Sequence, residues 1–228
     1  MNIAIILASG IGSRFSKDEI KQFVEINNVP LLVLSIRAFE ENDNINKILV
    51  VTNDVEKVKG YILKYGFKKI INVISGGQSR QESVFKGLQE LKKLAINDDD
   101  IILIHDGARP LVSQKIINEN VIETKKYGDV TTALKITSTI SKAENNKLLQ
   151  IVPRDDLYEI QTPQSFKFID ILSAHDFALK NKINKASDDA QLVKLIGKDV
   201  YIVNGERQNI KLTTKEDLLL IESLLAKK

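Results

Sequence analysis

The chain has 228 residues and no cysteine, which excludes thiol catalysis, thiolate metal sites and a disulfide framework. Its 33 basic and 30 acidic residues leave a formal net charge of +3, and its lysine pairs are short, so we expect solvated mixed surfaces and no nucleic-acid partner. The length favours one domain spanning residues 1–228, which needs no covalent staple to fold. Apolar runs are far shorter than the roughly 20 residues of a membrane span, and MNIAIILASG lacks the basic start of a signal peptide. We therefore expect a cytoplasmic protein with no membrane partner.

Short runs rich in Ile and Val recur along the chain and predict strands. Most of them lack clean alternation of apolar and polar residues, which indicates strands buried on both faces of a parallel sheet. Helical patterns lie between them, and Ser79, Ser187 and Thr213 stand where helices are expected to begin. The predicted fold is an α/β three-layer sandwich with a Rossmann-like, mostly parallel sheet. The predicted strands are 3–7, 47–52, 70–75, 101–106, 130–136 and 200–205.

One segment, residues 135–166, breaks the alternation of strand and helix. It places two extended runs around the polar turn KAENNK, with no helical period between them. We predict a projecting hairpin arm at about 136–154. Because a two-stranded ribbon is marginally stable alone, we expect it to pack on a second subunit in a homodimer. The alternative is a hairpin folded onto its own domain.

The first predicted strand runs into the glycine-rich turn LASGIGSRF, followed by KQF. Glycines at 10 and 12 would let unpaired backbone N–H groups approach an anion. The stretch does not fit the P-loop pattern, and Phe15 occupies the third glycine position of the dinucleotide fingerprint. Arg14 and Lys21 would then be cations directed at a triphosphate. A plain tight turn with two surface cations is the alternative.

Three later segments carry further candidate site residues. Asp106 and Arg109 follow a buried strand in HDGARP, where Mg²⁺ and a phosphate could bind, although a helix cap and a surface ion pair would also explain them. Arg80 begins a helix after GGQS and could touch a nucleotide, as could Ser83. Lys211 precedes a helix, as a phosphate contact or a solvated lysine.

Taken together, these motifs resemble the sugar-alcohol-phosphate cytidylyltransferases, in particular the branch that acts on 2-C-methyl-D-erythritol 4-phosphate in non-mevalonate isoprenoid synthesis. The segments LASGIGSRF, GGQSRQESVFKGL, HDGARP, PRDDLYEIQTPQSF, SDDAQLV and GERQNIKLTTKEDL occur in that family's order and spacing. The resemblance implies the nucleotide-diphospho-sugar transferase fold, a cytidylyltransferase that uses CTP, a Mg²⁺ cofactor and a homodimer joined through the arm.

The resemblance also implies roles for single residues. It implies CTP binding by Ala8, Ser9, Gly10, Gly12, Gly76, Arg80 and Ser83. It implies catalytic roles for Arg14, Lys21, Arg154 and Lys211, and metal binding by Asp106. It implies polyol-phosphate binding by Arg109, Thr139, Thr162 and Ser187, with Arg154 and Thr139 reaching the site of the neighbouring subunit.

The chain departs from the family pattern at a few positions. Ile20 replaces the usual proline, and Ser138 and Ser141 replace a charged pair at the base of the arm. These serines leave ribitol 5-phosphate, a precursor of teichoic acids, as the alternative substrate, whereas SDDAQLV favours methylerythritol phosphate. A non-catalytic nucleotide-binding protein is the alternative of another class. The presence of all four residues Arg14, Lys21, Asp106 and Lys211 argues against it.

Overall fold

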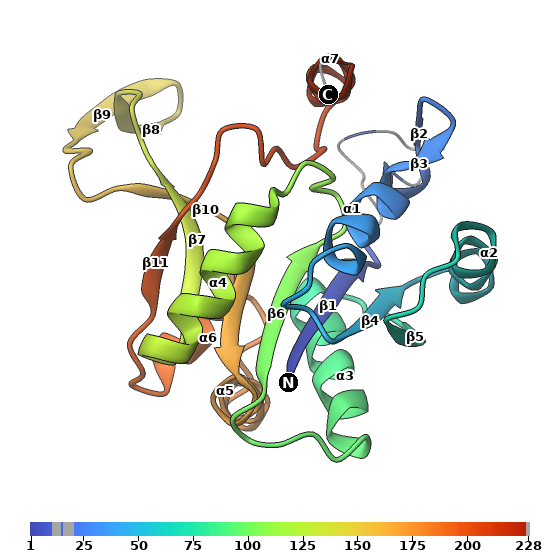
Figure 1. The fold of residues 1–228 in the computed structure, drawn as a ribbon. Coiled ribbons are helices and arrows are strands. Elements are labelled where there is room, and N and C mark those ends of the chain that lie inside the picture. Colours follow the sequence, from blue (N-terminus) through green and yellow to red (C-terminus); the bar gives the residue numbers. More distant parts are fainter. Residues whose placement is uncertain (11–14, 16–20, 227–228) are drawn as a thin grey trace.

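The architecture was obtained as a computed structural model that describes residues 1–10, 15 and 21–226. In this part of the chain seven strands form one sheet, in the order β11-β7-β10-β6-β1-β4-β5 (Figure 1). All of them run parallel except β10, which is antiparallel to both of its neighbours. The strands are β1 (Asn2–Ala8), β4 (Lys47–Thr52), β5 (Ile70–Ser75), β6 (Ile101–Asp106), β7 (Val130–Lys135), β10 (Tyr158–Lys167) and β11 (Tyr201–Asn204). The six predicted strands are confirmed.

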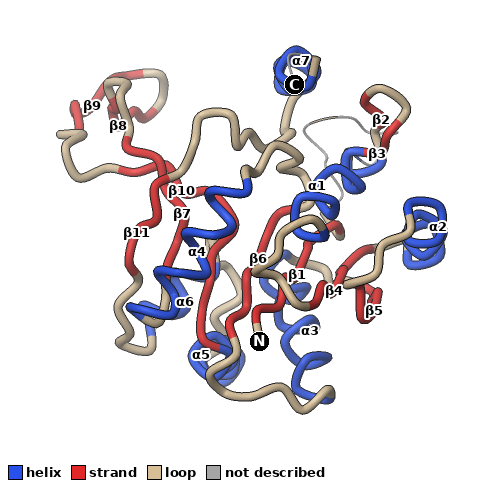
Figure 2. Tube along the Cα trace, viewed as in Figure 1, coloured by secondary structure: helices blue, strands red, loops and turns tan. Residues whose placement is uncertain are grey.

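Helices cover both faces of this sheet, so the three-layer sandwich is confirmed (Figure 2). One face carries α1 (Leu31–Glu40), α2 (Val55–Tyr65) and α4 (Gln114–Tyr127), and the other carries α3 (Arg80–Lys93), α5 (Phe168–Lys180) and α6 (Asp189–Leu195). Successive side chains of β1 point to opposite faces: Ile3 and Ile5 join one apolar cluster, and Ala4 and Ile6 join the other. Both clusters are buried, which explains why the central strands read as unbroken apolar runs.

The strand order places a topological switch point beside β1. The chain leaves β1 to form β4 on one side and later returns to form β6 on the other. In open α/β sheets the crevice at such a point, outside the carboxyl ends of the strands, is where ligands bind. The turn after β1 and the end of β6 therefore meet at this crevice.

The predicted arm is confirmed as a separate two-stranded sheet of β8 (Ile140–Glu144) and β9 (Lys147–Val152), which projects from the main sheet (Figure 1). Asn145 and Asn146 form its turn with φ of 50° and 63°, a conformation that asparagine tolerates and hairpin turns require. The extended run that follows the turn first completes the hairpin as β9 and then continues as β10. As β10 it inserts between β6 and β7 and carries the chain back into the central sheet.

Smaller elements complete the described chain: η1 (Lys21–Phe23), β2 (Glu25–Ile26), β3 (Val29–Pro30) and α7 (Lys215–Leu225). Two predicted helix starts were wrong by one residue. The N-cap of α6 is Asp188, whose carboxylate accepts from a backbone N–H in the first turn, and not Ser187. The N-cap of α7 is Thr214 and not Thr213, because Thr214 exchanges hydrogen bonds with Asp217 in a capping box. None of the described helices is long and apolar enough to cross a membrane.

Candidate active site

A cleft of about 470 Å³ lies at the carboxyl ends of β1 and β6. Ser9 and Gly10 enter it from the turn after β1, Arg80 from the start of α3, and Asp106 from the end of β6. Ala8, the last residue of β1, is buried directly behind that turn. The described residues that line the cleft are Leu7, Ser9, Gly10, Lys21, Gln22, Asn53, Gly77, Gln78, Ser79, Arg80, Asp106, Ala108 and Lys211. The structure thus brings together predicted residues that are more than 200 positions apart in the chain.

One wall of the cleft depends on the close approach of two turns at Gly76 and Ser9. A Cβ atom on Gly76 would lie 2.3 Å from the Cβ of Ser9, which is closer than real Cβ atoms come. Ser83 fixes both turns: its hydroxyl donates to the Ser79 carbonyl at 2.8 Å and accepts from Gly77 N at 3.0 Å. Since its single proton is used in this way, Ser9 must be the donor in the 2.7 Å contact between the two hydroxyls. Gly76 and Ser83 therefore shape the wall from which Ser9 projects.

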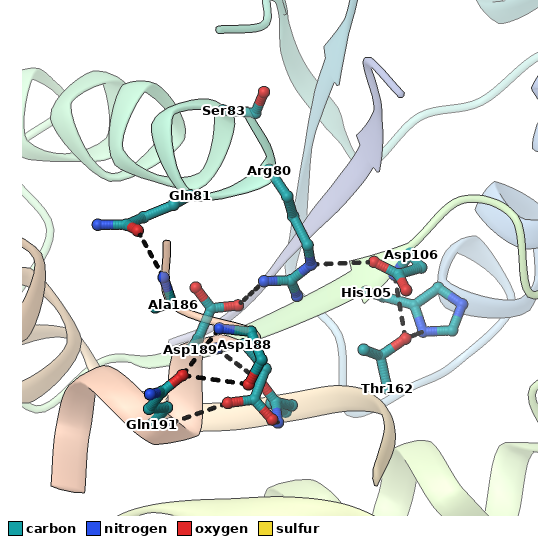
Figure 3. A network of polar contacts seen from close by, with 12 residues as sticks. Arg80, Gln81, Ser83, His105, Asp106, Thr162, Ala186, Asp188, Asp189 and Gln191 are labelled. Carbon is teal, nitrogen blue, oxygen red and sulfur yellow. Dashed lines mark hydrogen bonds and ion pairs between the residues drawn. The ribbon is translucent and has the colours of Figure 1, made fainter. Parts of the chain in front are cut away.

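Asp106 is the centre of a cluster of cations, of which Figure 3 shows Arg80. Its Oδ2 accepts from Lys211 Nζ at 2.7 Å, and its Oδ1 accepts from Arg80 Nε at 3.3 Å. Arg109 Nε lies 4.0 Å from Oδ2. Burial disfavours the charged carboxylate, but the three cations outweigh that penalty and hold the pKa of Asp106 well below its usual range. The carboxylate is therefore ionised at neutral pH.

A buried relay behind the cleft fixes the backbone at Asp106 (Figure 3). Thr162 Oγ1 accepts from Asp106 N at 3.1 Å and lies 3.2 Å from His105 Nδ1. His105 Nε2 lies 3.1 Å from the Arg109 carbonyl, which can only accept, so Nε2 carries the proton. Burial lowers the pKa of His105 to about 4; its Nδ1 is thus an acceptor for the Thr162 hydroxyl. Thr162 therefore lies behind Asp106 instead of lining the cleft.

A second cavity of about 610 Å³ adjoins the first through Lys211, which lines both. Arg109 lines this second cavity, and its Nη1 donates to the Asn209 carbonyl at 2.6 Å. Arg207, Gln161 and Asn209 also line it. Lys211 therefore stands where the two cavities meet, and both Lys211 and Arg109 form ion pairs with Asp106.

The glycine-rich turn is described only in part. Lys21 lines the cleft, and its Nζ donates to the Leu212 carbonyl at 3.1 Å. Gln22 is buried beside it and donates to the Gly10 carbonyl at 3.0 Å, which ties the two ends of the turn together. Gly12 and Arg14 lie outside the described residues, as does Ile20.

Three of the predicted residues are exposed and line neither cavity within the described part of one chain. Arg154 and Thr139 are exposed at the base of the arm, where Arg154 Nη1 donates to the Thr137 carbonyl. Ser187 is exposed before α6, and its hydroxyl donates to Gln191 Oε1 at 3.1 Å.

The structure also adds residues that the sequence did not single out for the site. Asp189 accepts from Arg80 Nη1 at 2.7 Å, and His175 Nε2 lies 3.1 Å from the other oxygen of Asp189. Asn53 donates to the Ser9 carbonyl at 2.6 Å. Asp189 could have been suspected from the sequence, because an arginine at the edge of a buried sheet needs a carboxylate partner; His175 and Asn53 carry no such signal.

The donor set at Asp106 suits Mg²⁺ bound to a nucleotide. Within the described residues no group of three or more His, Cys, Asp or Glu side chains could hold a metal ion. Mg²⁺ is usually held by one or two carboxylates together with substrate phosphates and water. A single ionised carboxylate in a cation-lined cleft fits that mode of binding and does not fit a metal held by protein ligands alone.

Comparisons with known proteins agree with this geometry. Residues 2–227 match the family model described as IspD: 2-C-methyl-D-erythritol 4-phosphate cytidylyltransferase. Relatives of that name from Thermosipho melanesiensis and Bacillus cytotoxicus are 43% identical over 223 residues and 40% identical over 227 residues. These matches cover 97% and 99% of this chain and 96% and 98% of the relatives. The crystal structure of the Francisella tularensis enzyme superposes with a TM-score of 0.84 at 29% identity, covering 97% of this chain and 98% of that one. The chain belongs to the 2-C-methyl-D-erythritol 4-phosphate cytidylyltransferase family.

Proposed function

We propose that this chain joins CTP to 2-C-methyl-D-erythritol 4-phosphate, forming the CDP-polyol and pyrophosphate for isoprenoid synthesis. A phosphate oxygen of the polyol phosphate attacks the α-phosphorus of CTP. A new P–O bond forms there, and the bond between the α-phosphorus and the bridging oxygen breaks to release pyrophosphate. The observation that carries the proposal is the ionised Asp106, held between Lys211 and Arg80 at the switch point of the sheet.

This reaction needs no general base, and the described cleft provides none. A phosphate monoester has its second pKa near 6, so the attacking group is largely a dianion at pH 7. Asp106 is the only acidic residue among the described residues that line the cleft. Its lowered pKa and its two cation partners make it a poor base. The barrier is therefore electrostatic, because two anions must approach each other.

Positive charges that the fold holds in place lower this electrostatic barrier. Lys21 reaches the cleft from η1 and Lys211 from the loop before α7, and both side chains are oriented by hydrogen bonds, to the Leu212 carbonyl and to Asp106 respectively. We assign Lys21 and Arg14 to the triphosphate and the departing pyrophosphate. Gly10 and Gly76 let the backbone approach the nucleotide, with Gly12 in the same role. Ser9 and Arg80 hold the nucleotide, and Ser83 acts by fixing Ser9.

Mg²⁺, when bound at Asp106, supplies further neutralisation of the triphosphate charge. The carboxylate oxygens already accept from Arg80 and Lys211. Both cations must therefore share Asp106 with the metal or turn towards the phosphates when CTP binds. Lys211 is well placed to turn, because it also lines the second cavity.

We assign the second cavity to the polyol phosphate. Arg109, Arg207 and Lys211 supply its cations within one chain. Thr162 would act by fixing Asp106, and Ser187 would contact the polyol only after the loop before α6 moves inward. Arg154 and Thr139 would complete the pocket from the neighbouring subunit, since neither lines a cavity in its own described chain.

The homodimer in this proposal is joined by the arm. Leu148, Leu149 and Ile151 on β9 are 64%, 61% and 53% exposed, on a two-stranded sheet that no other described strand extends. Leu148→Asp with Ile151→Asp should shift sedimentation from dimer to monomer, because these side chains lie opposite Ala143 and Ser141 of β8 and therefore share one face of the hairpin. Gln150→Asp, which adds an acid to the opposite face, is the matched control. An unchanged dimer in the double variant would remove the arm from the interface.

Mixing two inactive variants tests whether the arm acts on the neighbouring site. A mixed dimer pairs one subunit that carries Arg154→Ala with one that carries Lys211→Met. The first subunit keeps its own Lys211, so its site is complete only if Arg154 reaches it from the second subunit. Random exchange of subunits then restores about a quarter of the wild-type activity. No recovery would place Arg154 in the site of its own chain.

Ribitol 5-phosphate is not the favoured substrate, since the matched family and relatives carry the methylerythritol name. The reaction is tested by following CDP-polyol formation by phosphorus NMR with wild type and Asp106→Asn. Product from the wild type alone supports the proposal, and equal rates in both would remove Asp106 from the mechanism. A cytoplasmic location remains part of this proposal.

A further inference from the structure

A buried ionic chain continues behind Asp106, away from the cleft. Arg80 Nη1 donates to Asp189 Oδ2 at 2.7 Å, whereas its Nε donates to Asp106 Oδ1 at the longer distance of 3.3 Å. Its third nitrogen, Nη2, is buried without a hydrogen-bond partner among the described residues. The guanidinium is thus divided between two carboxylates and held more closely by the one outside the cleft (Figure 3).

Asp189 is fixed independently of Arg80. It is 1% exposed and stands at the first position of α6, where its backbone N–H donates to Gln164 Oε1 at 3.1 Å. Its second oxygen faces His175 Nε2 at 3.1 Å. A carboxylate only accepts hydrogen bonds, so His175 is the donor in this pair. His175 is itself held in α5, where its ring stacks on Phe85.

An arginine prefers to form two parallel hydrogen bonds with one carboxylate. Without Asp189, Arg80 would have Asp106 as its remaining carboxylate partner and could turn both a terminal nitrogen and Nε onto it. Two parallel bonds would engage both oxygens of Asp106, and Oδ2 already accepts from Lys211 Nζ at 2.7 Å. A divalent cation would then have to displace a paired arginine before it could reach the carboxylate.

We propose that Asp189, held by His175, is a positioning residue that limits Arg80 to one long hydrogen bond with Asp106, which a divalent cation can displace. This inference rests on the proposed function, because it requires a metal at Asp106. It assigns a role in metal affinity to two residues that touch neither substrate nor metal.

Binding of Mn²⁺ tests the inference without turnover. Free Mn²⁺ is measured by electron paramagnetic resonance in the presence of a saturating CTP analogue that cannot release pyrophosphate. Asp189→Asn keeps the shape of the side chain but removes its charge, and should weaken Mn²⁺ binding about tenfold, the scale of one charge-assisted hydrogen bond. His175→Leu should weaken binding in the same direction, and His175→Gln, which keeps an N–H donor, should restore it.

Two further variants separate the possible outcomes. In the Arg80→Met background, Asp189→Asn should have no additional effect, because the arginine that it restrains is gone. A tenfold loss that persists there would overturn the inference in favour of a direct effect of charge, as would unchanged Mn²⁺ binding in Asp189→Asn. Asp106→Asn reports on the proposed function: if it binds Mn²⁺ as the wild type does, the metal site itself is wrong. If only Asp106→Asn weakens binding, the metal site stands and the role of Asp189 is wrong. Thermal unfolding of each variant establishes that it is folded.

Discussion

Gly76→Ala should damage the nucleotide cleft through a single methyl group. The new Cβ would lie 2.3 Å from Ser9 Cβ and 2.7 Å from Ser9 Oγ, with Ser83 Oγ at 3.1 Å. The nearest atom belongs to the root of a side chain and cannot turn away, so the two turns must separate. Overpacking of this kind costs about 1–3 kcal/mol. Each 1.4 kcal/mol of that cost that falls on nucleotide binding raises the KM for CTP about tenfold.

Thermal unfolding measures the part of this cost that falls on the stability of the fold. The KM for CTP measures the part that falls on nucleotide binding. In a chain of this size a loss of 1 kcal/mol lowers Tm by about 2–4 °C. Gly60→Ala is the matched control: a Cβ at Gly60, inside α2, meets nothing within 4 Å, so this change should stabilise the helix by about 0.5–1 kcal/mol. Ser9→Gly combined with Gly76→Ala removes both clashing atoms and should recover the Tm lost by Gly76→Ala alone. A Gly76→Ala protein with the Tm and the KM for CTP of wild type would refute the reasoning.

Three further outcomes follow from the structure. Lys21→Ala should reduce turnover at least ~10²-fold, comparable to the loss of one oxyanion donor, and near-normal kcat would remove Lys21 from catalysis. Burial raises the pKa of Asp129 from 3.8 to about 7, and the charge of the neighbouring Asp170 adds to the effect. Between these two values the folded state holds a proton that the unfolded state has released. The folded state therefore loses stability as the pH rises from 3.8 to about 7. Asp129→Asn should therefore raise Tm relative to wild type more at pH 8 than at pH 5; an equal gain at both values would contradict the assignment. Lys211→Met should raise the Kd values for both CTP and the polyol phosphate, measured by calorimetry without turnover, because Lys211 lines both cavities, and a change in only one of them would separate the two pockets.

The central sheet could be predicted because its strands are buried on both faces. An apolar run such as IILIHD has to lie in the interior, and its last residue, Asp106, falls at the edge where ligands bind. The arm could be predicted from its polar turn and the absence of helical spacing. The position of β10 between β6 and β7 could not, since strand order depends on contacts distant in sequence.

It was harder to predict which polar residues of the site pair with one another. Each of Asp106, Arg80 and Lys211 stands in a motif, but the pairing of Arg80 with both Asp106 and Asp189 arises only when α3, β6 and α6 pack together. Thr162 occurs in a motif too, yet its hydroxyl faces His105 behind the cleft. The helix starts at Ser187 and Thr213 were each misplaced by one residue, because Asp188 and Thr214 make equally good caps in the sequence and packing selects between them.

The most direct test of the account is pyrophosphate release from CTP and Mg²⁺, measured in parallel with 2-C-methyl-D-erythritol 4-phosphate and with ribitol 5-phosphate. The account predicts Mg²⁺-dependent release with the methylerythritol substrate and little with ribitol phosphate. Release with ribitol phosphate alone would contradict the assigned substrate and turn attention to Ser138 and Ser141 at the base of the arm. No release with either substrate, from a folded protein that still binds CTP, would contradict the proposed reaction itself.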